Sequence, residues 1–344
     1  MANQGVENVS STALLHRAPR HESPWINHHL WYHAKPEEVP TTQAALDLIS
    51  HLTRHGMHVL TLPAVSADDD PDYAAAVMRR ANRRGIRILP NVGPDAFAAR
   101  DAADLTIDER FAIASQWFDK GAHGLELGEQ MANAGAQHST HWDVRELQAW
   151  MKFMNDDAVM SICLRGSSFD EIAQRALDDY FDVFRFRVVG APQLSAQNYF
   201  EQSSASFQMF DAAGALPSWN ASWEVLTNVS GQLSRSALLL ATCYLPGIVH
   251  FEKDVHLQSP STRHALRMRD SLGMHKANVL IDTTTAADGF IWLINDRVSM
   301  LLNFGPYSYD IPNDGRVLMS SLIALPESGS NLVLPPGEVA WVQR

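Results

Sequence analysis

Residues 72–89, DYAAAVMRRANRRGIRIL, decide the fold of this chain. Residues 72–84 form a candidate helix, and Gly85 follows as the kind of residue that commonly ends one. Residues 86–89 come next without a linker and form the short apolar run typical of a buried strand. A helix that leads directly into a strand is the repeating unit of proteins built around a parallel sheet.

The same alternation of apolar runs and amphipathic stretches extends to both sides of this segment. We predict strands at 29–32, 58–62, 86–89, 124–127, 158–163, 183–188, 216–222 and 247–251. We predict helices at 41–55, 72–84, 107–120, 143–154, 168–177, within 196–213, at 232–244 and at 260–272. Eight such units over about 240 residues match the size of a closed (β/α)8 TIM barrel. An open doubly wound sheet is the alternative α/β architecture, and the lack of a glycine-rich phosphate turn after the first strand disfavours it.

The pattern changes at about residue 278, after which no stretch has the helical period. Strand-like runs at 279–281, 290–294, 298–302, 317–319 and 338–342 are separated by turn formers such as Asp288-Gly289. We therefore predict three parts. They are a flexible N-terminal arm at 1–24, which is polar and aperiodic, the barrel at 25–274, and an antiparallel C-terminal β-sandwich domain at 275–344.

Composition and charge exclude several classes of partner. The chain has 39 acidic and 27 basic side chains and a formal net charge of −12, which disfavours nucleic acids and anionic membranes. No apolar run is long enough to predict a transmembrane helix, and the N-terminus lacks the features of a secretory signal. The two cysteines, Cys163 and Cys243, lie in apolar stretches and are interpreted as buried thiols. We expect a cytoplasmic protein without a cofactor.

Four short stretches, in order along the chain, resemble glycoside hydrolase family 13, the α-amylase/α-glucosidase superfamily, and especially its α-glucosidase-type members. They are RGIRIL at 84–89, WFDKGAHGL at 117–125, LLL at 238–240 with LPG at 245–247, and LPPGEVAW at 334–341. No single stretch is specific, but their order and spacing together are. The resemblance implies a barrel whose functional groups lie at the carboxyl ends of the strands.

The residues that carry this family's chemistry are missing from the matching positions. Retaining glycosidases use a carboxylate nucleophile and a carboxylic acid about 5–5.5 Å apart. By the resemblance, Asn91 replaces a carboxylate after the third strand, Gly128 replaces the nucleophile, and Ile162 replaces the acid. Glycine cannot act as a nucleophile and isoleucine cannot protonate a leaving oxygen, so the site is predicted to be degenerate.

Other carboxylates near the strand ends leave an alternative open. Glu126 and Glu129 follow the fourth strand, and Glu252 follows the eighth. As a relocated catalytic pair, Glu126 and Glu252 would have to face each other across the barrel mouth. Solvated loop acids are the simpler interpretation, because the chain has a large excess of acidic residues.

Aromatic residues near the predicted strand ends are candidates for stacking on sugar rings: Trp31, Tyr32, Trp142 and Trp223. Packing in the core is the commoner role of aromatic residues in barrels, and it stays the competing interpretation.

No metal site is predicted. His51, His55 and His58 have a spacing that can bind zinc, but a barrel helix faces outward here, and we interpret them as surface histidines. The acidic run at 68–70 lacks the spaced ligands of a calcium loop, and its charge suits the N-terminus of the next helix. A metal-dependent barrel enzyme of another family is a more distant alternative.

Together these observations predict a catalytically inactive pseudo-glycosidase with a binding or assembly role. The alternative is an active α-glucoside hydrolase or transglycosylase that uses relocated carboxylates, drawn from Glu126, Glu129 and Glu252. The expected partner is an α-glucoside-type sugar or a protein, and a homo-oligomer stays open.

Overall fold

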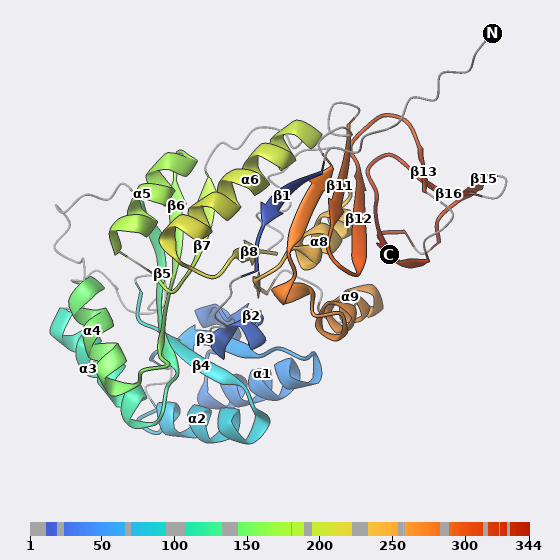
Figure 1. The fold of residues 1–344 in the computed structure, drawn as a ribbon. Coiled ribbons are helices and arrows are strands. Elements are labelled where there is room, and N and C mark those ends of the chain that lie inside the picture. Colours follow the sequence, from blue (N-terminus) through green and yellow to red (C-terminus); the bar gives the residue numbers. More distant parts are fainter. Residues whose placement is uncertain are drawn as a thin grey trace, which may run out of the picture.

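The computed structural model describes most of the chain: residues 12–18, 24–65, 70–93, 107–132, 144–179, 181–188, 195–221, 233–253, 257, 259–282, 289–311, 316–322, 324–328 and 331–344. Within these residues the chain forms an eight-stranded parallel sheet wrapped by helices, and an antiparallel β-structure follows it (Figure 1).

The parallel sheet forms a nearly closed barrel. Its strands are β2 (Leu30–His33), β3 (Val59–Pro63), β4 (Arg87–Asn91), β5 (Gly124–Met131), β6 (Val159–Gly166), β7 (Val183–Val188), β8 (Ser218–Asn220) and β9 (Ile248–Phe251). They follow the order β7-β6-β5-β4-β3-β2-β9-β8. The two end strands meet where Leu216 N–H donates to the carbonyl of Asp182 at 3.4 Å. All eight predicted strands are therefore confirmed, with small shifts at their ends.

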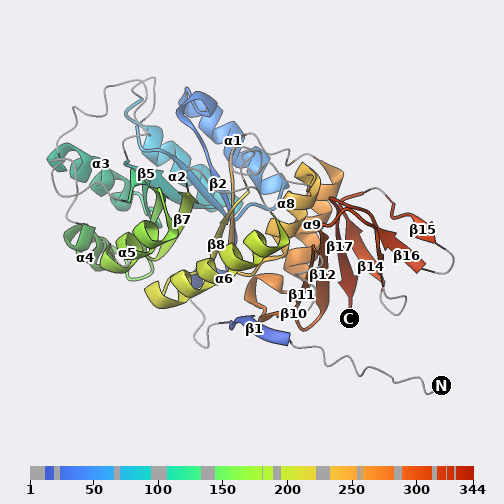
Figure 2. The same ribbon diagram turned by 90° about the horizontal axis from the view of Figure 1, so that it is seen from above.

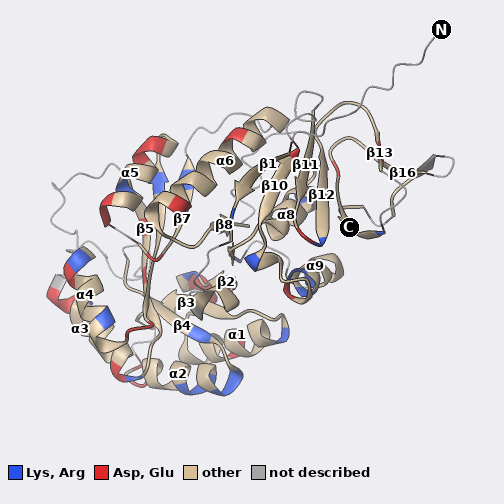
Figure 3. Cartoon of the chain, in the orientation of Figure 1, with Lys and Arg blue, Asp and Glu red and all other residues tan. Residues whose placement is uncertain are grey.

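Helices cover the outside of this barrel (Figure 2). They are α1 (Thr42–Arg54), α2 (Tyr73–Arg84), α3 (Ile107–Asp119), α4 (Val144–Met154), α5 (Phe169–Asp179), α6 (Ala196–Ala213), α8 (Arg235–Tyr244) and α9 (Pro260–Ser271), with short 3-10 turns at Pro24–Asn27, Pro36–Glu38 and Met274–Lys276. The Thr41 hydroxyl accepts from Ala44 N–H at the start of α1, and Gly85 ends α2 with a φ of 68°. Charged residues of both signs are spread over the outer helices (Figure 3).

The period-two pattern of the strands separates the core into an outer and an inner part. Side chains such as Leu60, Ile88 and Phe184 face the helices and belong to the large apolar core. Inward side chains of the strands form a second apolar cluster together with Trp25 of the 3-10 turn before β2. We call this cluster the lower layer, and its strand residues are Trp31, Val59, Leu89, Val159, Val183 and Ile248. Above this layer the barrel interior becomes polar.

The C-terminal part is a two-sheet sandwich, as predicted. One sheet has the order β1-β10-β11-β12-β17-β14, from β1 (Thr12–His16), β10 (Val279–Asp282), β11 (Phe290–Ile294), β12 (Val298–Asn303), β17 (Val339–Gln343) and β14 (Val317–Ser320). The other contains β13 (Tyr309–Ile311), β16 (Asn331–Leu334) and β15 (Glu327–Ser328). Buried side chains from both sheets, including Leu301, Ile311 and Leu334, pack together.

The N-terminal segment differs from the prediction of a flexible arm. Residues 12–16 form β1, which pairs antiparallel with β10, and Ala18 N–H donates to the side chain of Asn278 at 2.9 Å. His16 is buried and its ring stacks on Phe207 of α6. The free edge of β10 offers backbone N–H and C=O groups for pairing. Residues 12–16 form a strand on this edge, which the polar composition of the N-terminal region did not suggest.

In the part of the chain that the structure describes, no helix combines the length and the apolar character needed to cross a membrane.

Candidate functional site at the barrel mouth

A β-bulge in β5 brings two glutamates to the same side of the sheet. Glu126 and Glu129 are three positions apart, so in a regular strand they would face opposite ways. The pairing of β5 with β6 shifts register between these two residues, and Gly128 has a φ of 72° there. Both glutamates consequently contact basic side chains of the barrel interior. Gly128, which the resemblance placed at the nucleophile, makes this bulge possible.

The chain after β4 packs closely on the bulge. A Cβ added to Gly93 would lie 2.1 Å from the carbonyl oxygen of Leu127, so only glycine fits there. Asn91, at a position where the family carries a carboxylate, is almost buried, and its Oδ1 accepts from Gly93 N–H at 2.9 Å. Asn91 therefore holds a turn in the backbone.

Directly above the lower layer lies a buried polar network, the middle layer, formed by His33, Thr61, Glu126, Arg185 and His250. Glu126 is fully buried, and its Oε1 lies 3.5 Å from a guanidinium nitrogen of Arg185. Its Oε2 lies 3.9 Å from Nδ1 of His33. The guanidinium supplies the opposite charge that a buried carboxylate needs.

His33 contacts three groups of this network. One guanidinium nitrogen of Arg185 lies 3.1 Å from Nδ1 of His33 and 3.4 Å from its Nε2, so it lies over the ring. The hydroxyl of Thr61 lies 2.8 Å from Nδ1, and Nε2 shares a hydrogen bond of 2.7 Å with Nδ1 of His250. Burial, with the charge of Arg185 added, holds the pKa of both imidazoles well below the usual value. Both rings are therefore neutral at pH 7.

Closer to solvent lies a second set of charged side chains, the mouth cluster, formed by Lys35, Glu129, Arg165, Arg187 and Glu252. Arg187 joins the two acids, because its guanidinium lies 3.0 Å from Glu252 and 3.5 Å from Glu129. Arg165 contacts Glu129 at 3.1 Å, and Lys35 lies 3.8 Å from Glu252. The interpretation of these acids as solvated loop residues is wrong for Glu126 and Glu252, which are buried inside the barrel.

The resemblance placed the missing acid at Ile162, but this side chain faces the helices and belongs to the outer core. Its neighbour Cys163 faces the interior, in register with Glu129 on β5 and Arg185 on β7. Burial raises the pKa of the Cys163 thiol to about 12, so it stays protonated and unreactive.

Two of the four aromatic residues predicted to stack on sugars, Trp31 and Tyr32, lie away from the mouth. Trp31 is fully buried in the lower layer, where its indole N–H donates to the carbonyl of His28 at 2.5 Å. Tyr32 points the opposite way along β2, and its hydroxyl donates to Glu38 at 2.6 Å. Neither is at the mouth, because alternation along β2 sends one ring to the base and the other outside. Trp142 and Trp223 lie outside the described residues.

The other candidates from the sequence are separated by the fold. His51 and His55 contact each other on α1, with ring centroids 4.4 Å apart, whereas His58 lies beside His29. Asp70 accepts from the hydroxyl of Thr42 at 2.6 Å and from Asp72 N–H, so it serves a turn near the start of α2. Asp68 and Asp69 are outside the described residues.

The basic half of the site, Arg185 and Arg187, was not predicted from the sequence. Arg185 and Arg187 alternate with Phe184 and Phe186 in β7, so the period-two rule places both arginines on one face. This alternation was the available signal, and it points two arginines into a barrel.

A cavity of about 670 Å3 lies at the opposite, amino end of the barrel, lined by Trp25, Lys152, Asp182 and Asp211 among others.

A nearly closed parallel barrel followed by an antiparallel sandwich is an α/β barrel fold, and this architecture matches that of solved structures from glycoside hydrolase family 13. A glycoside hydrolase enzyme of subfamily GH13_31 superposes with a TM-score of 0.65, at 10% identity, over 93% of this chain and 99% of that one. Trehalose-6-phosphate hydrolase of Bacillus licheniformis superposes with a TM-score of 0.61, at 10% identity, over the same shares. These identities show the fold alone. No family profile and no curated relative matches the sequence.

Proposed function

We propose that this chain is a non-hydrolytic barrel of the glycoside hydrolase family 13 type, which binds a polyhydroxylated ligand such as an α-glucoside at its mouth. One observation carries the proposal. The carboxylates that the described strand ends direct into the barrel, Glu126, Glu129 and Glu252, each face an arginine guanidinium within 3.5 Å.

These pairs oppose acid–base catalysis of glycoside cleavage. One carboxyl group of a glycosidase must be protonated at working pH so that it can protonate the leaving oxygen. A neighbouring guanidinium stabilises the ionised form of a carboxyl group instead. The guanidinium of Arg185 lies 3.5 Å from Glu126, and that of Arg187 lies within 3.5 Å of Glu129 and Glu252.

The mouth cluster nevertheless has the groups that a sugar requires. Guanidinium and ammonium groups donate hydrogen bonds, and carboxylates accept them, so alternating hydroxyl groups find both. Lys35 and Arg165 are nearly half exposed, at 48% and 46%, while Arg187 and Glu252 are largely buried. The long, partly exposed side chains of Lys35 and Arg165 therefore flank the largely buried Arg187–Glu252 pair and form the binding surface above the middle layer.

The test has an activity part and a binding part. Aryl α-glucosides incubated with the protein are expected to release p-nitrophenol no faster than a buffer blank. Maltose-type sugars are expected to raise the melting temperature, because a ligand of the folded state stabilises it. An Arg187→Met variant should lose this increase, and an Arg83→Met variant, at the end of α2 that leads into the amino end of β4, should keep it. Hydrolysis by the unaltered chain would refute the inert site.

One observation favours the second candidate, an active hydrolase with relocated carboxylates: Glu126 and Glu252 do face the barrel interior. If it is correct, the chain releases p-nitrophenol and a Glu126→Gln variant abolishes the release while it remains folded. A protein partner, a homo-oligomer and a cytoplasmic location remain predictions from the sequence.

A further inference from the structure

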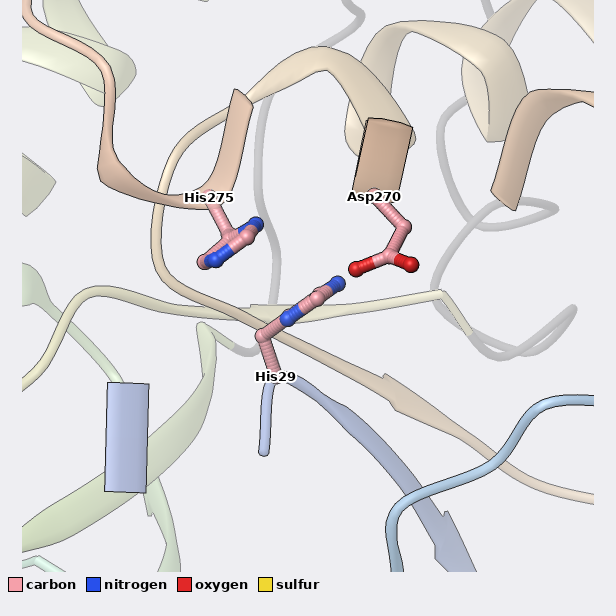
Figure 4. Close-up of side chains that lie close together, drawn as sticks. All are labelled: His29, Asp270 and His275. Carbon is pink, nitrogen blue, oxygen red and sulfur yellow. The ribbon is translucent and has the colours of Figure 1, made fainter. Parts of the chain in front are cut away.

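A second cluster of polar side chains lies at the amino end of the barrel, opposite the mouth. It contains His29 just before β2, Asp270 near the end of α9, and His275 in the following 3-10 turn (Figure 4). One ligand-type atom from each residue lies within 4.8 Å of the other two. The imidazoles of His29 and His275 stack with centroids 3.9 Å apart and planes 6° apart.

His29 is the observation that needs an explanation. Its side chain is fully buried, yet neither ring nitrogen has a hydrogen-bond partner. Nδ1 of His275 is also buried without one, and so is Nδ1 of His58, whose ring lies 4.9 Å from that of His29. An unsatisfied buried polar group costs about 1–3 kcal/mol, so native proteins rarely keep three in one place without a ligand.

We propose that His29, Asp270 and His275 bind one divalent transition-metal ion of the zinc type. Two imidazole nitrogens and one carboxylate oxygen form a donor set that zinc accepts, with water or His58 as the fourth ligand. Binding requires two movements from the present arrangement. Asp270 is exposed, so its carboxylate can move inward. One of the two stacked rings must also rotate, because the in-plane electron pairs of parallel imidazoles do not meet at one ion.

The donor atoms of the cluster are of the kind that a zinc-type ion takes. Each imidazole can offer one ring nitrogen with a free electron pair, and Asp270 offers carboxylate oxygens. Arg269 is the neighbouring cation, and the carbonyl groups of Cys243, Leu245 and Gly247 hold its guanidinium.

The position of the cluster indicates a structural role. His29 leads into the first barrel strand, whereas Asp270 and His275 belong to the segment that joins the barrel to the C-terminal sheet. An ion bound by all three would fasten that segment to the base of the barrel. The amino end of such barrels serves stability, while ligand chemistry takes place at the other end.

Cobalt(II) is the probe for the test, because its visible absorption reports coordination by imidazole and carboxylate. Chelator-treated protein without a histidine tag is titrated with Co2+. We expect saturation at one equivalent, a four- or five-coordinate spectrum, and displacement by Zn2+. Asp270→Asn and His275→Asn should each weaken Co2+ binding at least tenfold while they keep the circular dichroism spectrum.

The double variant His51→Gln/His55→Gln is the matched control, since this pair on α1 has metal-binding spacing outside the cluster. It should bind Co2+ with unchanged affinity and spectrum. Absence of saturable binding to the folded, unaltered chain overturns the proposal, and so does full binding by an Asp270→Asn/His275→Asn double variant. Neither result depends on whether the mouth binds a sugar.

Discussion

The guanidinium of Arg185 lies 3.5 Å from the carboxylate of Glu126, in the middle of the barrel where 5% and 0% of their surfaces are exposed. A buried ion pair costs desolvation, and removal of one partner leaves the other charge unpaired. The pair is therefore expected to determine the shape of the interior more than to add stability.

Removal of one partner should be costly and removal of both much less so. Arg185→Met or Glu126→Gln alone is expected to lower the free energy of unfolding by about 3–5 kcal/mol. The double variant should recover a large part of this loss, and urea denaturation of the four proteins measures the difference. Additive losses would show that the two groups do not act as a pair.

Gly93 is expected to tolerate no side chain. Gly93→Ala places a Cβ against the carbonyl of Leu127, so backbone of β5 must move and the bulge at Gly128 with it. Gly56→Ala is the control, because Gly56 has a φ of 74° with nothing within 4 Å of an added Cβ. We expect Gly56→Ala to lower the free energy of unfolding by about 1 kcal/mol, from backbone strain alone, and Gly93→Ala to lower it clearly more. Urea denaturation measures both. Equal losses would contradict the close approach.

His16 should make stability depend on pH. Burial lowers the pKa of His16 from 6.5 to about 4, so between these values the unfolded chain binds a proton that the folded chain does not. Stability from this group is present above pH 6.5 and is lost as the pH falls to 4, by at most about 3 kcal/mol. The carboxylate of Asp211 lies 3.8 Å from His16. Burial raises the pKa of Asp211, so its contribution to stability changes with pH in the opposite direction.

A His16→Phe variant keeps a ring to stack on Phe207 and removes the titration. The measurement is the free energy of unfolding at several pH values between 7.5 and 4. The variant should show a shallower decline than the unaltered protein. Parallel curves for the two proteins would mean that His16 is not the titrating group.

Tyr244 is expected to couple the barrel to the C-terminal sheet. It lies in α8, and its buried hydroxyl contacts the carbonyls of Val298 at 2.7 Å and Leu293 at 3.2 Å. Tyr244→Phe removes this donor and should lower the free energy of unfolding by about 1–3 kcal/mol. Amide hydrogen exchange should become faster in β11 and β12 than in the barrel strands. An equal increase in all strands would argue against a local coupling.

The sequence predicted the fold well because its information was local. Glycines such as Gly85 end helices where apolar runs begin, and the change of period near residue 278 marks the sandwich. The barrel interior was harder to predict. The bulge at Gly128 turns Glu129 inward, and nothing in a regular two-residue period announces it.

The site also depends on contacts between distant segments. Glu252 was interpreted as a loop acid because its partner, Arg187, is 65 residues away in the sequence. The cluster of His29 with Asp270 and His275 is similarly invisible in a linear sequence, since the barrel must close before they meet. His58, by contrast, was grouped with His51 by spacing and lies beside His29 instead.

The pairing of β1 with β10 has a consequence for biosynthesis. Ala18 and Asn278, which are bonded to each other, lie 260 positions apart in the sequence, so the emerging β1 has no partner until β10 has left the ribosome. During that interval its backbone is exposed to chaperones and to neighbouring nascent chains.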